Sequence, residues 1–116
     1  ADILIHTPWY EGEGLVFAEA AACGTIIAGT SVGLLADMGP ECAIQAAPGE
    51  TDFLADKIYQ ELKSENVLKN IQGAARRWIE EKDVNYTELK VVEILNELLA
   101  NADSQRLKAL PDKTER

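Results

Sequence analysis

The chain has 116 residues, of which 47% are apolar and 27% charged, and its net charge at neutral pH is -9. This length predicts one globular domain and is short for two, and no apolar run reaches the roughly 20 residues of a membrane-spanning helix. No Lys or Arg precedes Lys57, so residues 1–56 carry nine acidic side chains and no base; we expect no nucleic-acid partner, because such binding needs a basic face.

Three short apolar segments have the length and composition of strands buried on both faces: residues 1–7, 25–29 and 42–47. The order strand, helix, strand predicts right-handed parallel crossovers. Because doubly wound domains generally contain five or six strands, we expect the back half of such a domain, with further strands before Ala1.

The segment between the first two strands predicts a short, alanine-rich helix over residues 15–23, entered at Gly14 and ended at Gly24. Its first N–H groups lack a partner inside the helix, and the macrodipole makes that end positive, so it can receive an anion such as a diphosphate. Glu11 precedes this end. Glu19 lies about one turn inside the helix and leans back toward it, so its carboxylate can reach groups attached to the anion.

The rest of the chain is predicted to be mostly helical. Residues 30–40 contain glycines toward both ends, Gly33 and Gly39, and predict a ligand-side loop with one short helical turn. Helical spacing of apolar residues follows at 51–64, from Val67 to Trp78, and from Leu89 to Leu99. We expect a domain over residues 1–100 and a polar segment over 101–116 that is a frayed tail or a linker.

The cysteines and the histidine do not suggest a metal site. Cys23 and Cys42 stand 19 positions apart without a paired spacing, and His6 lies in the apolar first segment. We expect both cysteines to be reduced and the protein to be cytoplasmic.

Several stretches together resemble the C-terminal donor-binding domain of retaining GT-B glycosyltransferases of the family 4 type. The most specific are ADILI at 1–5, YEGEGLV at 10–16 and EAAACG at 19–24. Residues 48–50, 74–76 and Trp78 also fit, so the resemblance covers residues 1 to about 100. It implies an α/β fold, namely a partial Rossmann-like, three-layer domain with a parallel sheet, followed by C-terminal helices.

The resemblance also implies roles for individual residues. Glu19 would accept hydrogen bonds from the two ribose hydroxyls of a nucleotide-sugar, and the backbone N–H groups of Leu15 and Val16 would hold its diphosphate. Glu11, the catalytic candidate, would contact donor-sugar hydroxyls and orient the anomeric carbon. The expected substrate-binding residues are Glu11, Gly12, Glu13, Gly14, Leu15, Val16 and Glu19.

The expected reaction is transfer of the sugar with retention, without a metal or another cofactor. In the family the acceptor site and the cations that neutralise the diphosphate lie upstream, so we expect a missing N-terminal domain and an inactive isolated chain. The acceptor is open among a glycan, a lipid and a small molecule, and a peripheral membrane location of the full-length protein is the alternative to a purely cytoplasmic one. Two other functions also stay open: a non-catalytic nucleotide-binding or interaction module, and a nucleotide-sugar epimerase of GT-B architecture.

Overall fold

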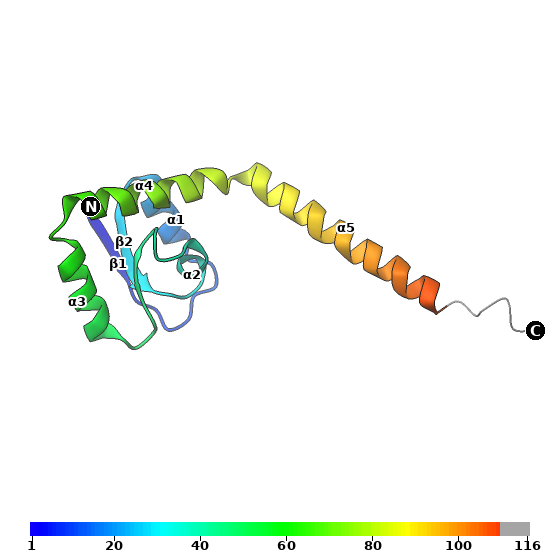
Figure 1. Cartoon of the computed structure of the whole chain (residues 1–116), viewed down its shortest axis with the longest axis horizontal. Helices are drawn as coiled ribbons and strands as arrows, with labels where there is room; N and C mark the ends of the chain where they lie inside the picture. Colours follow the sequence, from blue (N-terminus) through cyan, green and yellow to red (C-terminus); the bar gives the residue numbers. More distant parts are fainter. Residues whose placement is uncertain (110–116) are drawn as a thin grey trace, which may run out of the picture. The chain divides into compact units, whose positions relative to one another are not determined.

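The computed structural model describes residues 1–109, and the chain divides into two units, Ala1–Glu81 and Lys82–Arg116. The first unit is a three-stranded parallel sheet in the order β1-β2-β3 with four helices around it (Figure 1). Its elements are β1 (Ile3–His6), α1 (Leu15–Ala22), β2 (Ile26–Thr30), α2 (Leu34–Met38), β3 (Ile44–Ala46), α3 (Thr51–Glu61) and α4 (Glu65–Glu81).

The sheet confirms the predicted α/β class and the parallel strand pairing. Ile3 pairs with Ile26 between β1 and β2, and Ala28 pairs with Ile44 between β2 and β3. Every residue of β2 and of β3 is buried. Burial of both faces explains why these strands read as continuous apolar runs in the sequence.

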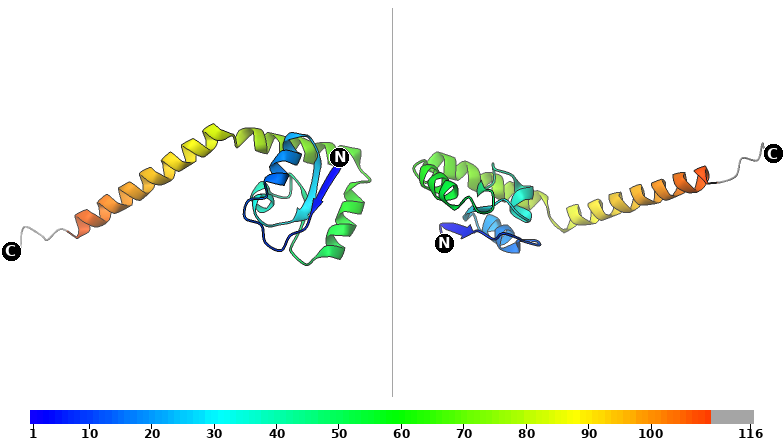
Figure 2. Two further views of the ribbon diagram at one scale, coloured as in Figure 1. Left: turned by 180° about the vertical axis from the view of Figure 1, so that it is seen from behind. Right: turned by 90° about the horizontal axis from the view of Figure 1, so that it is seen from below.

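Alternate residues of the strands face two separate hydrophobic clusters, because side chains in a strand point to opposite faces in turn. Ile27 packs with Phe17 and Ala21 of α1 on one face. Ile26 and Ala28 lie on the other face, in a cluster that contains residues of α3 and α4. Figure 2 shows these helices around the sheet. α1 is thereby fixed on one face of the sheet, directly after the loop that follows β1.

α1 begins and ends close to the predicted positions. Gly14 precedes it with φ of 79°, and Gly24 follows it with φ of 72°, in the left-handed region that favours glycine. The Phe17 N–H donates to the Gly14 carbonyl at 2.9 Å and closes the first turn. In the predicted ligand-side loop, α2 supplies the expected short helical turn.

The second unit contains a single described element, α5 (Val84–Lys108). It starts earlier than predicted because the Asp83 carboxylate caps it, accepting the Tyr86 N–H at 3.0 Å. It also continues through residues 101–108, which the sequence predicted to be a frayed tail or a linker.

The helix extends there because adding residues to an existing helix needs no new nucleation, and Arg106 and Lys108 interact favourably with its C-terminal dipole. Residues 101–108 lack a hydrophobic period because this part of the helix is exposed on all sides. The last residues of the predicted tail, 110–116, lie outside the described residues. A domain end near residue 100 stays a prediction.

Candidate functional site

The loops that follow the three strands meet at one edge of the sheet, since the carboxyl ends of parallel strands share an edge. The Thr30 hydroxyl at the end of β2 donates to the Pro8 carbonyl at 2.6 Å. Trp9 lies against Gly49, where an added Cβ would come within 2.8 Å of the Trp9 ring. The loop after β1 is therefore tied to the end of β2 and packed on the loop after β3.

His6, the last residue of β1, is held at this edge by a close backbone approach. A Cβ added to Gly29 would lie 2.2 Å from the His6 carbonyl oxygen, so only glycine allows β2 to come this near. The His6 ring packs on the Phe17 ring with 5.5 Å between centroids. Strand pairing and ring packing together fix where the imidazole lies.

Glu11 is the most enclosed of the predicted site residues that carry a functional side chain. Its Oε2 lies 3.1 Å from His6 Nε2, and its side chain is only 26% exposed. Cβ atoms added to Gly14 and Gly33 would lie 3.2 Å and 3.0 Å from its Cγ. Glu11 therefore stands between the end of β1 and two glycines, one before α1 and one before α2.

The remaining predicted residues with side chains are more open. Glu13, Leu15, Val16 and Glu19 are all exposed, and the carboxylates of Glu13 and Glu19 make no hydrogen bond or ion pair with another residue in the range 1–109. The backbone of Glu13 is fixed, because its carbonyl accepts the Leu34 N–H at 2.9 Å. The two unpaired carboxylates remain available to a ligand.

Two neighbours of Glu11 were missed by the sequence reasoning. The sequence places His6 in the first predicted strand and Gly33 in the loop after the second, and it predicts no contact of either residue with Glu11. The available signal is position: His6 lies near the end of the first predicted strand and Gly33 in the loop after the second, and the carboxyl ends of parallel strands lie at the same edge of a sheet.

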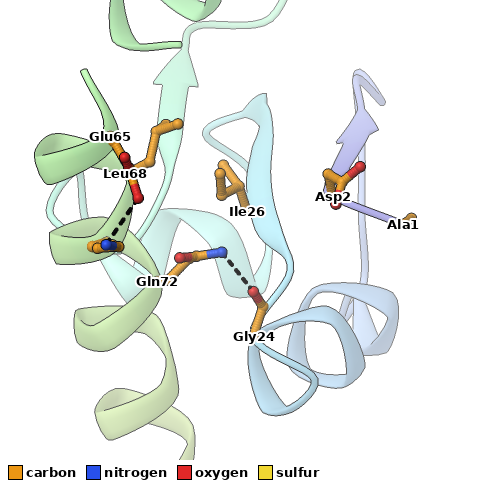
Figure 3. A pocket seen from close by; sticks show the side chains of 8 residues that line it. Ala1, Asp2, Gly24, Ile26, Glu65, Leu68 and Gln72 are labelled. Carbon is orange, nitrogen blue, oxygen red and sulfur yellow. Dashed lines mark hydrogen bonds and ion pairs between the residues drawn. The ribbon is translucent and has the colours of Figure 1, made fainter. Parts of the chain in front are cut away.

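A pocket of about 300 Å³ lies elsewhere, at the amino ends of β1 and β2 (Figure 3). Gln72 of α4 donates to the Gly24 carbonyl at 2.8 Å, and Glu65 pairs with Lys69 at 2.9 Å. The lining residues are Ala1, Asp2, Gly24, Ile26, Glu65, Leu68, Lys69 and Gln72. None of the predicted site residues lines it, so this pocket is separate from the candidate site.

Residues 1–109 contain no group of three or more His, Cys, Asp or Glu side chains that could hold a metal ion. Within the same range, no helix combines the length and the apolar character needed to cross a membrane.

Comparison with known proteins gives matches among solved structures. No family model matches the chain, and no curated protein matches it. Sucrose-phosphate synthase from Thermosynechococcus elongatus is similar with a TM-score of 0.68 and 25% identity, over 87% of this chain and 26% of that one. Anabaena HepE, in complex with UDP, is similar with a TM-score of 0.69 and 23% identity, over 84% of this chain and 28% of that one.

Both structures are GT-B glycosyltransferases, and the chain has the fold of part of a GT-B C-terminal domain, as the resemblance predicted. The chain spans only about a quarter of the length of either structure.

Proposed function

We propose that the chain contributes the donor-binding part of a glycosyltransferase site, which binds a nucleotide-diphosphate sugar for transfer to an acceptor. The similarity in fold to two glycosyltransferases supports the transferase class. The UDP bound to HepE supports a uridine nucleotide as the ligand to test first.

The diphosphate would bind at the start of α1. Gly14 itself carries no side chain and adopts a left-handed conformation, and the N–H groups of Leu15 and Val16 directly after it open the helix. These groups and the helix dipole favour an anion. The same groups would stabilise the diphosphate as its negative charge increases during departure from the sugar, which lowers the barrier to transfer.

The ribose would bind to Glu19. Its carboxylate is exposed and unpaired in the described part of the chain, one helical turn beyond Leu15. A carboxylate offers two acceptor oxygens and can therefore take hydrogen bonds from two adjacent hydroxyls.

The donor sugar would lie against Glu11, which orients the anomeric carbon for attack by the acceptor. Transfer with retention, in which the leaving diphosphate helps to deprotonate the acceptor hydroxyl, is the finer part of the proposal. The acceptor and the cations that balance the diphosphate would come from parts of a longer protein.

One observation supports the proposal most strongly. The first residue of α1 follows the enclosed Glu11 in the chain and precedes the exposed Glu19. Calorimetric titration of UDP into the chain tests it. Glu19→Ala should weaken UDP binding by about tenfold or more, because two hydrogen bonds to a charged group are lost.

Glu65→Ala is the matched control, since Glu65 is also exposed but lines the pocket at the opposite edge of the sheet. An unchanged affinity in Glu19→Ala contradicts the ribose assignment. If only Glu65→Ala weakens UDP binding, the nucleotide binds in the pocket that Glu65 lines.

A further inference from the structure

We propose that His6 is a positioning residue, which holds one carboxylate oxygen of Glu11 and leaves the other to a single hydroxyl of the donor sugar. This inference rests on the proposed function, because it assigns a partner to the residue that would contact the sugar. It goes beyond that function because Glu11 would offer the sugar one acceptor oxygen instead of two.

The contact between the two side chains defines which atom donates. His6 Nε2 and Glu11 Oε2 are 3.1 Å apart. An ionised carboxylate only accepts hydrogen bonds, so Nε2 must carry the proton. Oε2 is then directed toward the imidazole, and Oε1 is the oxygen left for a ligand.

The imidazole is positioned by the backbone of His6 and by one ring contact, and 41% of the side chain is exposed. The His6 backbone carbonyl lies so close to Gly29 that a Cβ there would be 2.2 Å away, and the ring packs on Phe17. The donor atom is therefore fixed by the β1–β2 pairing and by the buried side chain of α1.

The stem of Glu11 is confined as well. Gly14 and Gly33 lie against it, and Cβ atoms at these positions would come within 3.2 Å and 3.0 Å of its Cγ. A carboxylate held by its stem and by one oxygen has little freedom to rotate. Such pre-organisation lowers the entropy that a sugar hydroxyl must offset when it binds.

The first test uses the fact that His6 is the only histidine of the chain. A long-range ¹H–¹⁵N NMR spectrum of the imidazole nitrogens therefore reports on this ring alone. In its neutral form, the imidazole of the free chain should show the Nε2–H tautomer. The Nδ1–H tautomer would overturn the proposal, because Nε2 could then not donate to Glu11.

The second test separates positioning from folding. UDP and three nucleotide-sugars, UDP-glucose, UDP-galactose and UDP-N-acetylglucosamine, are titrated into the chain by calorimetry. His6→Leu removes the donor and should weaken the tightest nucleotide-sugar about three- to tenfold while leaving UDP affinity unchanged. His6→Gln keeps an N–H donor at similar reach and should restore most of the loss.

The outcomes distinguish this inference from the proposed function. An equal loss for UDP and for the nucleotide-sugars would show a structural role of His6 and overturn the positioning role. Nucleotide-sugars that bind no tighter than UDP to the unmodified chain would also overturn it. No UDP binding at all would overturn the proposed function and the sugar role with it, whereas the tautomer would still decide whether the His6–Glu11 bond forms.

Discussion

Gly29 determines how closely β2 approaches the end of β1, and so where His6 stands. Gly29→Ala should destabilise the chain by about 2 kcal/mol or more, because its Cβ would meet a backbone carbonyl 2.2 Å away that has no rotamer to change. Chemical denaturation followed by circular dichroism measures this loss.

Gly12→Ala is the matched control for that substitution. Nothing lies within 4 Å of a Cβ at Gly12, so its free energy of unfolding should change by less than about 0.5 kcal/mol. Similar effects of the two substitutions would contradict the close approach between Gly29 and His6.

Cys42 gives the chain a predicted weakness at alkaline pH. Burial raises the pKa of the Cys42 thiol, and the neighbouring Glu41 carboxylate raises it further. Above the ordinary thiol pKa the unfolded state loses this proton while the folded state keeps it, so stability falls as pH rises through that range. Thermal denaturation between about pH 7 and 10 should show this decline.

Cys42→Ala should reduce that decline, although it lowers stability at neutral pH by leaving space in the core. Cys23, which is exposed, should react rapidly with a thiol reagent in the folded chain, whereas Cys42 should not. An unchanged pH dependence in Cys42→Ala would show that other groups cause the decline.

At this scale, the sequence located candidate residues but not their contacts. Glu11 and Glu19 could be selected because a glycine, a short helix and two carboxylates follow one another in the chain. The contacts of Glu11 with His6 and Gly33 could not be predicted, because they depend on the exact path of two loops. The roles of Glu11 and Glu19 stay predictions.

Gly73 lies in the middle of α4, although glycine has a low helix propensity. A Cβ there would meet only the end of the flexible Arg77 side chain, 3.2 Å away, and φ is not in the left-handed region. Gly73→Ala should therefore stabilise the chain by about 0.5–1 kcal/mol, through helix propensity and a less disordered unfolded state. Urea denaturation measures the change.

Gly49→Ala is the opposite case and serves as its control. Gly49 has φ of 88°, and its added Cβ would lie 2.8 Å from the Trp9 ring. This substitution should therefore lower the free energy of unfolding of the chain. A loss of stability in Gly73→Ala would mean that the Arg77 side chain cannot move aside.

Elements with a buried face were predictable, and exposed ones were less so. The three strands and α1 to α4 lie close to the predicted segments, because strands buried on both faces leave continuous apolar runs and helices with one buried face leave a period of 3.6 residues. The ends of α5 were missed: residues 101–108 are exposed and carry no such period, and the start depends on the Asp83 cap.

The uneven charge of the whole chain predicts an unusual response to salt. Residues 1–56, which hold the entire candidate site, carry nine acidic side chains and no Lys or Arg. Their combined field repels an anionic ligand, and salt screens that repulsion. UDP affinity should therefore stay constant or rise when NaCl is increased from about 20 to 200 mM, which calorimetry can measure.

Uridine is the control ligand, because it lacks phosphates and its binding should not depend on salt. A steep fall of UDP affinity with salt would contradict this prediction. It would indicate that Lys or Arg side chains from the second half of the chain neutralise the diphosphate.

The contact of Trp9 with Gly49 has a consequence for how such a sequence can evolve. With a tryptophan at position 9, the Cβ of any other residue at position 49 would contact the indole ring. A larger side chain at position 49 would displace the tryptophan from its packed position. Among relatives, we therefore expect the two positions to vary together. A relative that replaces the glycine should also carry a smaller residue in the loop after β1, although the two positions stand 40 apart in the chain.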